Sequence, residues 1–336
     1  MMMVVSQYNS TKFKWLSFAA ICCVIAGHSF VREGSFFNLV IPTLAQWHVP
    51  WFFFLSGILL YYSFFKQPSV AVLKKKMKGL VLPYILWALI AYFISGGFYQ
   101  IGFNCDKMFG ITTAFPVGNP HLWYLHALIS FSLISVFIWM CVGRLTFAKS
   151  IAVFSALYLL IYGIALSMHW STLYGTPSSP FYFLTGFVLS HQVLKRDQMN
   201  PKKCLYCFLI VVSMAVASRC AWFVLNWQGM KEVVLRMICV VLQIGAVWFG
   251  YDVIVSRLGK VDFHRYITPI FFVYCFHGLL LPFLKKSWVL CCGSSTISCN
   301  VGVVFVCFFT ISVSFAVANL LRWLMPKVYG ILTGGR

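Results

Sequence analysis

The chain has 336 residues, of which 61% are hydrophobic, 18% aromatic and only 10% charged. Soluble domains carry about a quarter charged residues, so this composition excludes a water-facing protein. The formal net charge of +20 arises from 26 Lys and Arg against six Asp and Glu. These basic residues are spread over separate segments, so we expect them to set membrane orientation and contact anionic lipid headgroups, and we expect no nucleic-acid partner.

The apolar residues fall into ten runs, close to the roughly 20 residues that one membrane-spanning helix needs. In chain order the runs cover 15–31, 47–65, 79–98, 121–142, 150–168, 180–194, 204–225, 233–251, 267–284 and 300–321. They are apolar on all faces and lack the residue-by-residue alternation of a membrane barrel. The sequence therefore predicts an all-α polytopic bundle of about ten transmembrane helices, forming a single domain over residues 1–336.

The basic residues predict the orientation of this bundle. With a cytoplasmic amino terminus, nineteen of them lie in inner segments and five in outer loops, while Arg219 and Arg236 fall inside spans. Cytoplasmic segments are enriched in Lys and Arg, so both termini are predicted to be cytoplasmic, as tails 1–14 and 322–336. The first run is interpreted as a retained span because no small-residue cleavage site follows it. The expected location is the cell (inner) membrane.

The thirteen cysteines do not indicate a disulfide framework, because most lie within spans, where a thiol acts as a small apolar residue. Cys204 and Cys207 form a CxxC, but a second pair and a nearby histidine are missing, so we expect no metal site. Four cysteines in predicted outer loops could pair in an oxidising compartment. These are Cys105, Cys291, Cys292 and Cys299.

Polar side chains at membrane depth are costly and are candidates for function. Five of the eight histidines fall in the outer half of the predicted bundle: His28, His48, His121, His126 and His277. Any one of them could be a packing residue, but a shared depth is harder to explain by packing alone. Every acidic residue is predicted in a loop or at a span end, which disfavours a buried carboxylate relay. A histidine acting as general base or transient nucleophile fits better.

Several local patterns accompany these histidines. Trp15–Gly27 is an apolar run that leads directly into His28, and Val49–Gly57 reads Val-Pro-Trp-Phe-Phe-Phe-Leu-Ser-Gly. A lysine cluster precedes Leu82-Pro83-Tyr84, and His121–Leu125 reads His-Leu-Trp-Tyr-Leu. Val273–His277 reads Val-Tyr-Cys-Phe-His. In this order and at these depths, the patterns resemble the membrane-bound acyltransferase-3 family, the O-acetyltransferases that modify surface glycans.

Two positions depart from the pattern of that family. Ser17 stands eleven residues before His28, where the family usually has a basic residue. Lys14 lies on the same helical face, about 21 Å from His28, and could substitute by reaching along the helix. Gly79 also stands where a basic residue is common, although Lys76 and Lys78 are close by.

The resemblance implies a reaction and a set of roles. A cytoplasmic acyl-CoA, with acetyl-CoA expected, would donate its acyl group to a hydroxyl of a glycan or lipid-linked sugar on the outer side. His28 is the implied catalytic residue, with His277, His126 and Ser56 as secondary candidates. The implied donor-binding residues are Lys14, Lys74, Lys75, Lys76 and Lys78. Those implied for the acceptor or for charge stabilisation are His121, Trp123, Tyr124, Arg219 and Arg236.

Partners are then the bilayer, acyl-CoA and the sugar acceptor, with no permanently bound cofactor. Ser56 and Gly57 also have a simpler interpretation, because small residues allow two helices to approach closely. An alternative for the whole chain is a carrier or flippase for a polar or lipid-linked solute. Such a protein needs helices broken near mid-membrane, whereas Pro269 and Pro282 lie near span ends.

Overall fold

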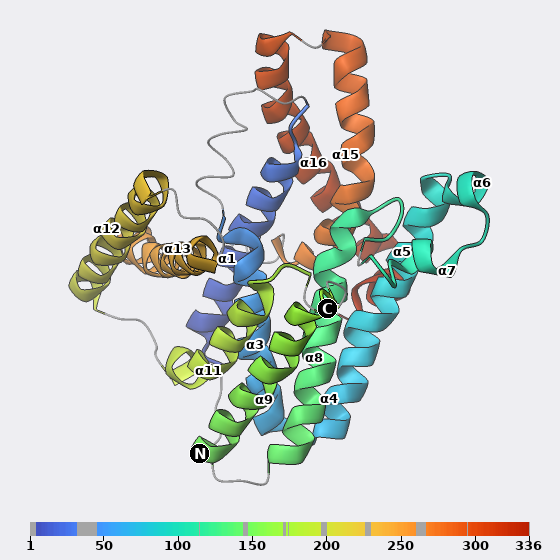
Figure 1. Ribbon diagram of the computed structural model, residues 1–336. Helices are drawn as coiled ribbons and strands as arrows, with labels where there is room; N and C mark the ends of the chain where they lie inside the picture. The colour runs from blue at the N-terminus through green and yellow to red at the C-terminus, as the bar shows by residue number, and fades with distance from the viewer. Residues whose placement is uncertain are drawn as a thin grey trace.

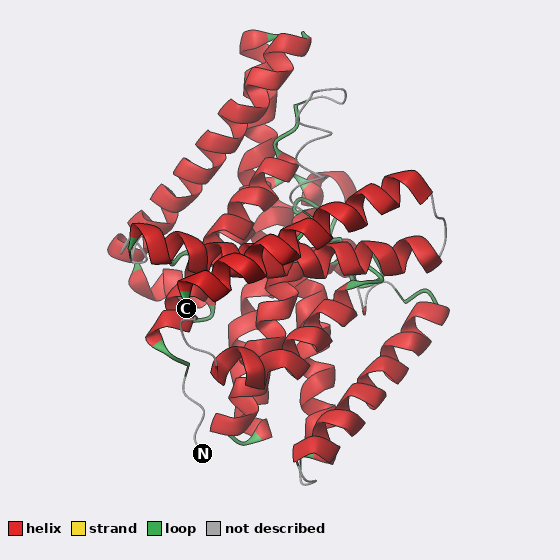
Figure 2. Ribbon diagram, turned by 90° about the vertical axis from the view of Figure 1, so that its left-hand side faces the viewer, coloured by secondary structure: helices red, strands yellow, loops and turns green. Residues whose placement is uncertain are grey.

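The computed structural model describes residues 5–31, 46–113, 115–143, 147–170, 173, 175–195, 200–225, 230–259, 267–293 and 295–335. Within these ranges every regular element is a helix (Figure 2). Nine of the described helices are long and apolar enough to cross a membrane. The chain is therefore an all-α polytopic membrane protein, as its composition predicts.

The long helices follow the predicted runs in order. They are α1 (Gln7–His28), α3 (His48–Lys66), α4 (Ser69–Lys76) continued by the π-helical turn η1 (Met77–Val81) and α5 (Leu82–Ile94), α8 (Trp123–Val142), α9 (Phe147–Ser167), α11 (Ser179–Lys195), α12 (Pro201–Leu225), α13 (Met230–Leu258), α15 (Ile270–Cys292) and α16 (Thr296–Leu324). The shorter elements are α6 (Gly97–Ile101), α7 (Cys105–Phe109), η2 (Pro120–Leu122) and α17 (Pro326–Thr333). The sixth run is α11, whose 17 residues rise only about 26 Å.

The helix α1 lies at the centre of the arrangement and contacts α3, α13, α15 and α16 (Figure 1). On one side α3 packs against α11, and α8 packs against α9 and α4. The pair α12 and α13 pack on each other and run across the remaining helices (Figure 2). The hairpin of α15 and α16 extends beyond the rest of the bundle (Figure 1).

Two glycines create the tightest helix crossing. A Cβ atom on Gly57 of α3 would lie 2.1 Å from the carbonyl oxygen of Phe183 in α11, and one on Gly186 would lie 1.9 Å from the carbonyl oxygen of Phe54. Each helix thus presents a bare backbone to the other, which is how small residues support packing between membrane helices. The interpretation of Gly57 as a close-approach residue agrees with this geometry.

Several helices extend beyond the predicted runs, α1, α13 and α15 among them. The amino-terminal helix begins at Gln7, so residues 7–14 of the predicted tail are helical and Lys12 is buried in the bundle. The helix α13 continues to Leu258, which places Asp252 inside a helix and buried, and the expectation that every acidic residue lies in a loop or at a span end is wrong. Likewise, α15 continues to Cys292, so Lys285 lies within a helix and not in an outer loop. A charged residue ends an apolar run in the sequence. It does not end the helix, because the backbone hydrogen bonds continue past it and long charged side chains favour helical conformation.

The third span begins earlier than predicted. Lys74, Lys75 and Lys76 belong to α4, and Lys78 lies in η1, so the cluster forms part of a continuous helix and does not precede it. Lys74, Lys75 and Lys78 are exposed, and Lys76 is half-buried. The π-helical turn carries one extra residue per turn, a feature common at functional sites.

The carboxyl-terminal residues fold back onto the bundle. The helix α17 packs against α5, where the Trp87 indole donates a hydrogen bond of 3.0 Å to the carbonyl oxygen of Leu332. Tyr329 stacks on Phe272, and Gly334 lies against the backbone of Gly79. The predicted tail 322–336 is therefore mostly helical and docks on the bundle through a few residues, with Tyr329 and Thr333 buried. Sequence periodicity does not show such a contact.

The glycine crossing gives a stability prediction. Gly57→Ala and Gly186→Ala should each lower the thermal unfolding temperature in detergent, because the new methyl group overlaps a facing carbonyl and forces α3 and α11 apart. Overpacking of this kind costs about 1–3 kcal/mol or more. Gly163→Ala in α9 is the control, since a Cβ there meets nothing within 4 Å. Equal unfolding temperatures for all three variants would contradict this account of the crossing.

Candidate active site

His28 is the last residue of α1, and its side chain is half-buried. The following residue, Ser29, is fully buried and donates a hydrogen bond of 2.7 Å from its hydroxyl to the carbonyl oxygen of Ile25. Its backbone N–H also bonds to the carbonyl oxygen of Ala26. These bonds fix the end of the helix, and with it the direction of the imidazole.

His121 lies in the short turn η2, which is anchored to α15. The side-chain amide of Asn119 donates a bond of 2.8 Å to the carbonyl oxygen of Cys275, and the Tyr274 hydroxyl donates to the carbonyl oxygen of His121. Gly278 faces this turn, and a Cβ there would lie 2.2 Å from Asn119 Oδ1 and 2.8 Å from His121 Cδ2. The position of His121 thus depends on one buried amide, one tyrosine and one glycine.

His277 is completely buried in α15, and its Nδ1 atom lies 2.6 Å from the carbonyl oxygen of Tyr274. A carbonyl oxygen only accepts hydrogen bonds, so Nδ1 carries the proton and, in the neutral ring, Nε2 presents a lone pair. Within the described part of the chain, Nε2 finds no hydrogen-bond partner. A buried nitrogen with an unused lone pair is poised to accept a proton or a hydrogen bond.

The three imidazoles form one cluster, which we call the histidine cluster. The ring centroids of His28 and His121 lie 4.1 Å apart, those of His121 and His277 lie 5.1 Å apart, and those of His28 and His277 lie 6.2 Å apart. They come from α1, η2 and α15, so residues separated by almost 250 positions meet at one point. Because the rings are so close, protonation of one disfavours protonation of the others, which leaves neutral nitrogens available as bases.

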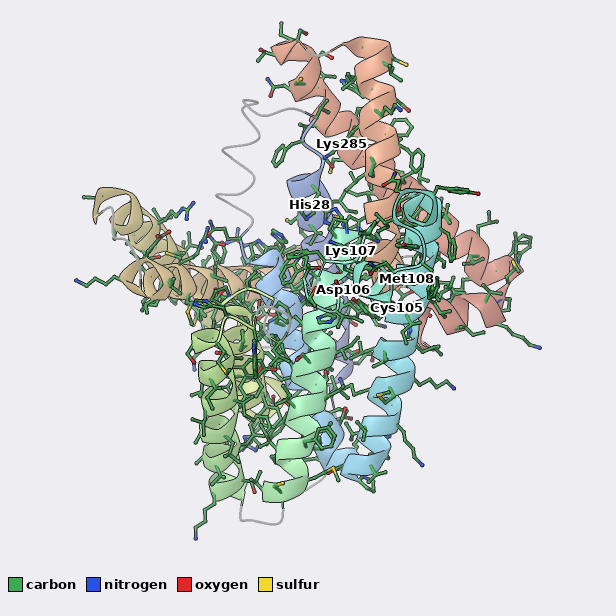
Figure 3. The ribbon with its side chains drawn as sticks, turned by 45° about the vertical axis from the view of Figure 1, so that its right-hand side comes forward. His28, Cys105, Asp106, Lys107, Met108 and Lys285 are labelled. Atoms are coloured by element: carbon green, nitrogen blue, oxygen red, sulfur yellow. The ribbon has the colours of Figure 1, made fainter. Side chains whose placement is uncertain are left out.

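Lys285 completes the surroundings of the cluster, and sequence reasoning missed it. It lies eight residues after His277 on α15, about two turns along the helix, and is half-buried (Figure 3). Figure 3 shows Lys285 on the same side of the bundle as His28, so this end of the molecule carries a positive charge. The spacing of two turns from His277 is a usable signal, but the predicted apolar run ends at residue 284, just before the lysine.

The other candidate residues have contacts with different parts of the chain. His126 packs against Tyr84, with ring centroids 5.6 Å apart, and Ser56 adjoins the Gly57 crossing. Arg219 of α12 donates a bond of 3.4 Å to Gln46, and Arg236 is exposed on α13. The roles expected of these four residues therefore stay predictions.

The aromatic residues that follow His121 support its position. Tyr124 is buried, with its ring 4.7 Å from that of Phe53 and 5.3 Å from that of Tyr274, the tyrosine that holds the η2 turn. Trp123 is half-buried and lies against Gly175. Both rings pack within the bundle, so they position η2 in this structure.

The positions expected to hold the donor are spread over two helices. Ser17, which replaces the usual basic residue, accepts a hydrogen bond of 3.1 Å from the Trp51 indole. Lys14 is half-buried on α1, and the lysine cluster lies on α4 and η1, near the end of the bundle opposite His28 (Figures 1 and 3). All thirteen cysteines are free thiols, including the four assigned to outer loops.

Comparison with known proteins agrees with the motifs. A family model described as an acyltransferase domain, Acyl_transf_3, matches residues 12–319. The chain belongs to the acyltransferase-3 family. It is thus a multi-pass membrane acyltransferase that transfers groups other than aminoacyl groups. The searches of curated proteins and of solved structures returned no match.

The anchoring of η2 gives a prediction for activity. Gly278→Ala should reduce acyl transfer at least tenfold while leaving the protein folded, because the added methyl group displaces Asn119 and His121. Gly27→Ala is the matched control: it adjoins His28, and its Cβ would meet nothing within 4 Å. The assay is incorporation of label from acetyl-CoA into membranes. Full activity in the Gly278 variant would show that the position of His121 is unimportant.

Proposed function

We propose that this acyltransferase transfers an acetyl group from cytoplasmic acetyl-CoA to a hydroxyl of a glycan or lipid-linked sugar on the outer side of the cell (inner) membrane. The observation that carries the proposal is the histidine cluster at the end of α1. The exposed lysines of α4 and η1 lie near the opposite end of the bundle. With both termini in the cytoplasm, the lysines face the donor and the histidines face the acceptor.

The chemistry begins at the acceptor hydroxyl. His28 and His121 are half-buried and still reachable, whereas His277 is completely buried. Of the two reachable rings, His28 ends the first span, where the family resemblance places the catalytic histidine, and it is the proposed base. His28 takes the proton as the hydroxyl oxygen attacks the thioester carbonyl carbon, the carbon–sulfur bond breaks, and the imidazolium returns the proton to the departing thiolate. In a second route, a His28 nitrogen attacks the thioester carbonyl carbon and the carbon–sulfur bond breaks to release the thiolate. The acyl group then passes from His28 to the acceptor hydroxyl, and the hydroxyl proton goes to the thiolate. The geometry is compatible with both routes.

The neighbours of His28 have separate roles in this proposal. His277, with Nδ1 held by the Tyr274 carbonyl, keeps an unbonded Nε2 lone pair that can accept a proton next to the rings of His28 and His121. His121 lies between His28 and His277 and guides the acceptor hydroxyl. The half-buried Lys285 ammonium, about two helical turns from His277, is the proposed partner for the negative charge that develops on the thioester oxygen.

The acyl donor must extend from the exposed lysines of α4 and η1 to His28. The exposed Lys74, Lys75 and Lys78 would hold the nucleotide phosphates by charge, while the thin pantetheine arm extends between helices towards His28. Lys76 and Lys14 are half-buried and would contact the arm further in. The family match favours this reaction over the carrier or flippase interpretation.

Replacement of the proposed base tests this function. His28→Ala should lower transfer from labelled acetyl-CoA in membranes about 100-fold or more, the usual contribution of a general base. His191→Ala in α11 is the control and should keep near-normal transfer. Both variants should elute as folded protein in size-exclusion chromatography. Undiminished transfer by the His28 variant would overturn the catalytic role, and solute flux independent of CoA would favour a carrier.

The lysine cluster gives a separate kinetic prediction. The triple change of Lys74, Lys75 and Lys78 to Ala should raise the KM for acetyl-CoA about tenfold and leave kcat nearly unchanged, because these side chains contribute binding and no chemistry. Changing Lys202 and Lys203 to Ala removes exposed charge from α12 and should alter neither constant. An unchanged KM in the triple variant would contradict the donor site.

A further inference from the structure

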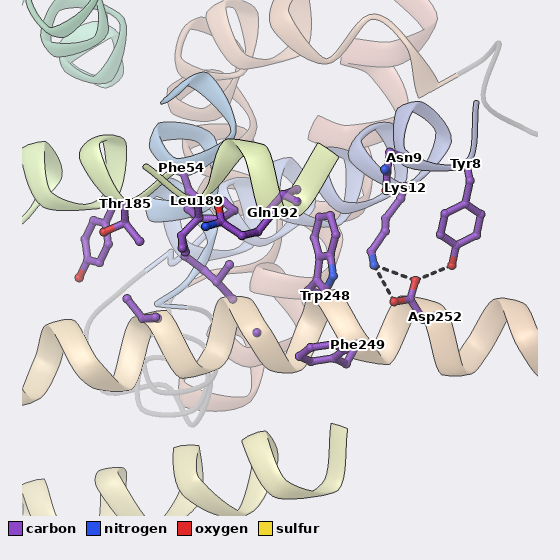
Figure 4. Close-up of a pocket in the computed structure, with 15 residues that line it drawn as sticks. Tyr8, Asn9, Lys12, Phe54, Thr185, Leu189, Gln192, Trp248, Phe249 and Asp252 are labelled. Atoms are coloured by element: carbon purple, nitrogen blue, oxygen red, sulfur yellow. Dashed lines mark hydrogen bonds and ion pairs between the residues drawn. The ribbon is translucent and has the colours of Figure 1, made fainter. Parts of the chain in front are cut away.

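A second candidate binding site lies between α1, α3, α11 and α13. A cavity of about 390 Å³ opens there, within the usual size range of small-molecule sites (Figure 4). One of its lining residues, Lys12, precedes His28 by sixteen positions on α1, about 24 Å along the helix axis. The cavity is therefore separate from the histidine cluster.

One end of the cavity is polar. Lys12 Nζ lies 2.7 Å and 2.8 Å from the two carboxylate oxygens of Asp252, and the Tyr8 hydroxyl donates to the same carboxylate (Figure 4). The ammonium also lies 3.5 Å from the centroid of the Trp248 ring. Lys12 and Asp252 are only 1% and 4% exposed, so this is a buried ion pair that carries both signs of charge and no net charge.

The remainder of the cavity is long and mainly apolar. From α13 its wall includes Val241, Ile244 and Trp248, which recur at helical spacing before Asp252. Asp252 follows Val241 by eleven positions, about 16 Å along the helix. The opposite wall comes from α11 and includes Leu189 and Val193. The space thus has a polar end and an apolar length, which is the chemical character of a lipid.

The surrounding helices leave this space open between them. The helix α11 packs mainly against α3, and α13 packs mainly against α12, so the two facing walls belong to different helix pairs. The polar end is formed by the first two turns of α1 and the last third of α13, and the apolar end by the middle of α13 and by α11. A lipid whose headgroup meets the ion pair and whose chain follows α13 has this same order of polar and apolar parts.

We propose that this cavity binds one hydrocarbon chain of a zwitterionic glycerophospholipid, whose headgroup faces the Lys12–Asp252 pair. The paired charges match a headgroup that itself carries one phosphate and one ammonium. The polyanionic nucleotide of CoA matches the cavity poorly, because the Lys12 charge is already neutralised by Asp252. This inference is independent of the proposed catalytic step.

Photolabelling in nanodiscs tests the proposal. The probe is phosphatidylethanolamine with a diazirine on one acyl chain, either near the headgroup or near the chain end, and the labelled peptides are identified by mass spectrometry. The first probe should label the Gln192 and Trp248 region, and the second should label the Tyr182 and Val241 region. Leu189→Trp, which fills the cavity, should reduce labelling of both regions at least fivefold.

The adjacent Val188→Trp is the matched control. Val188 is 36% exposed and Leu189 is 39% exposed, but only Leu189 lines the cavity, so Val188→Trp should leave labelling unchanged. Equal labelling of the two variants would overturn the site. Equal labelling by a phosphatidylglycerol probe would overturn the zwitterionic headgroup. Loss of labelling on addition of excess acetyl-CoA would overturn the lipid in favour of the donor.

Discussion

The structure depends on one constraint: a polar group at membrane depth needs a partner inside the protein. The backbone meets it by forming helices throughout the described residues. Side chains meet it by pairing across helices, as Lys12 does with Asp252 and as His277 does with the Tyr274 carbonyl. Among the buried groups that keep unused hydrogen-bonding capacity, Nε2 of His277 lies next to two other imidazoles, and chemistry is expected there.

Much of the fold could be predicted from the sequence because apolar runs of spanning length have few structural alternatives in lipid. The order of the helices and the short α11 follow directly from these runs. Helix ends could not be predicted as well. Long side chains such as those of Lys285 and Lys74 interrupt hydropathy without interrupting a helix, and Tyr329 packs against Phe272 only because the chain reverses after α16.

Part of the candidate site could also be predicted from the sequence. Depth and motif indicated His28, His121 and His277 as members of one layer, and three-dimensional packing shows that their rings meet, while His126 packs against Tyr84. The ion pair of Lys12 was hidden because its partner is 240 residues away in the chain. Pairings across helices depend on rotation and tilt, which a single sequence does not encode. The same long-range packing forms the cavity between α1, α3, α11 and α13, and no local sequence motif predicts it.

The central claim is that the histidine cluster receives an acyl group from one side of the membrane and delivers it on the other. Sealed inside-out vesicles test this most directly, with labelled acetyl-CoA added outside, at the cytoplasmic face. The account predicts label on glycan or lipid-linked sugar inside the vesicles, protected from an added esterase until detergent is present. Label that the esterase removes from intact vesicles would contradict transfer across the membrane.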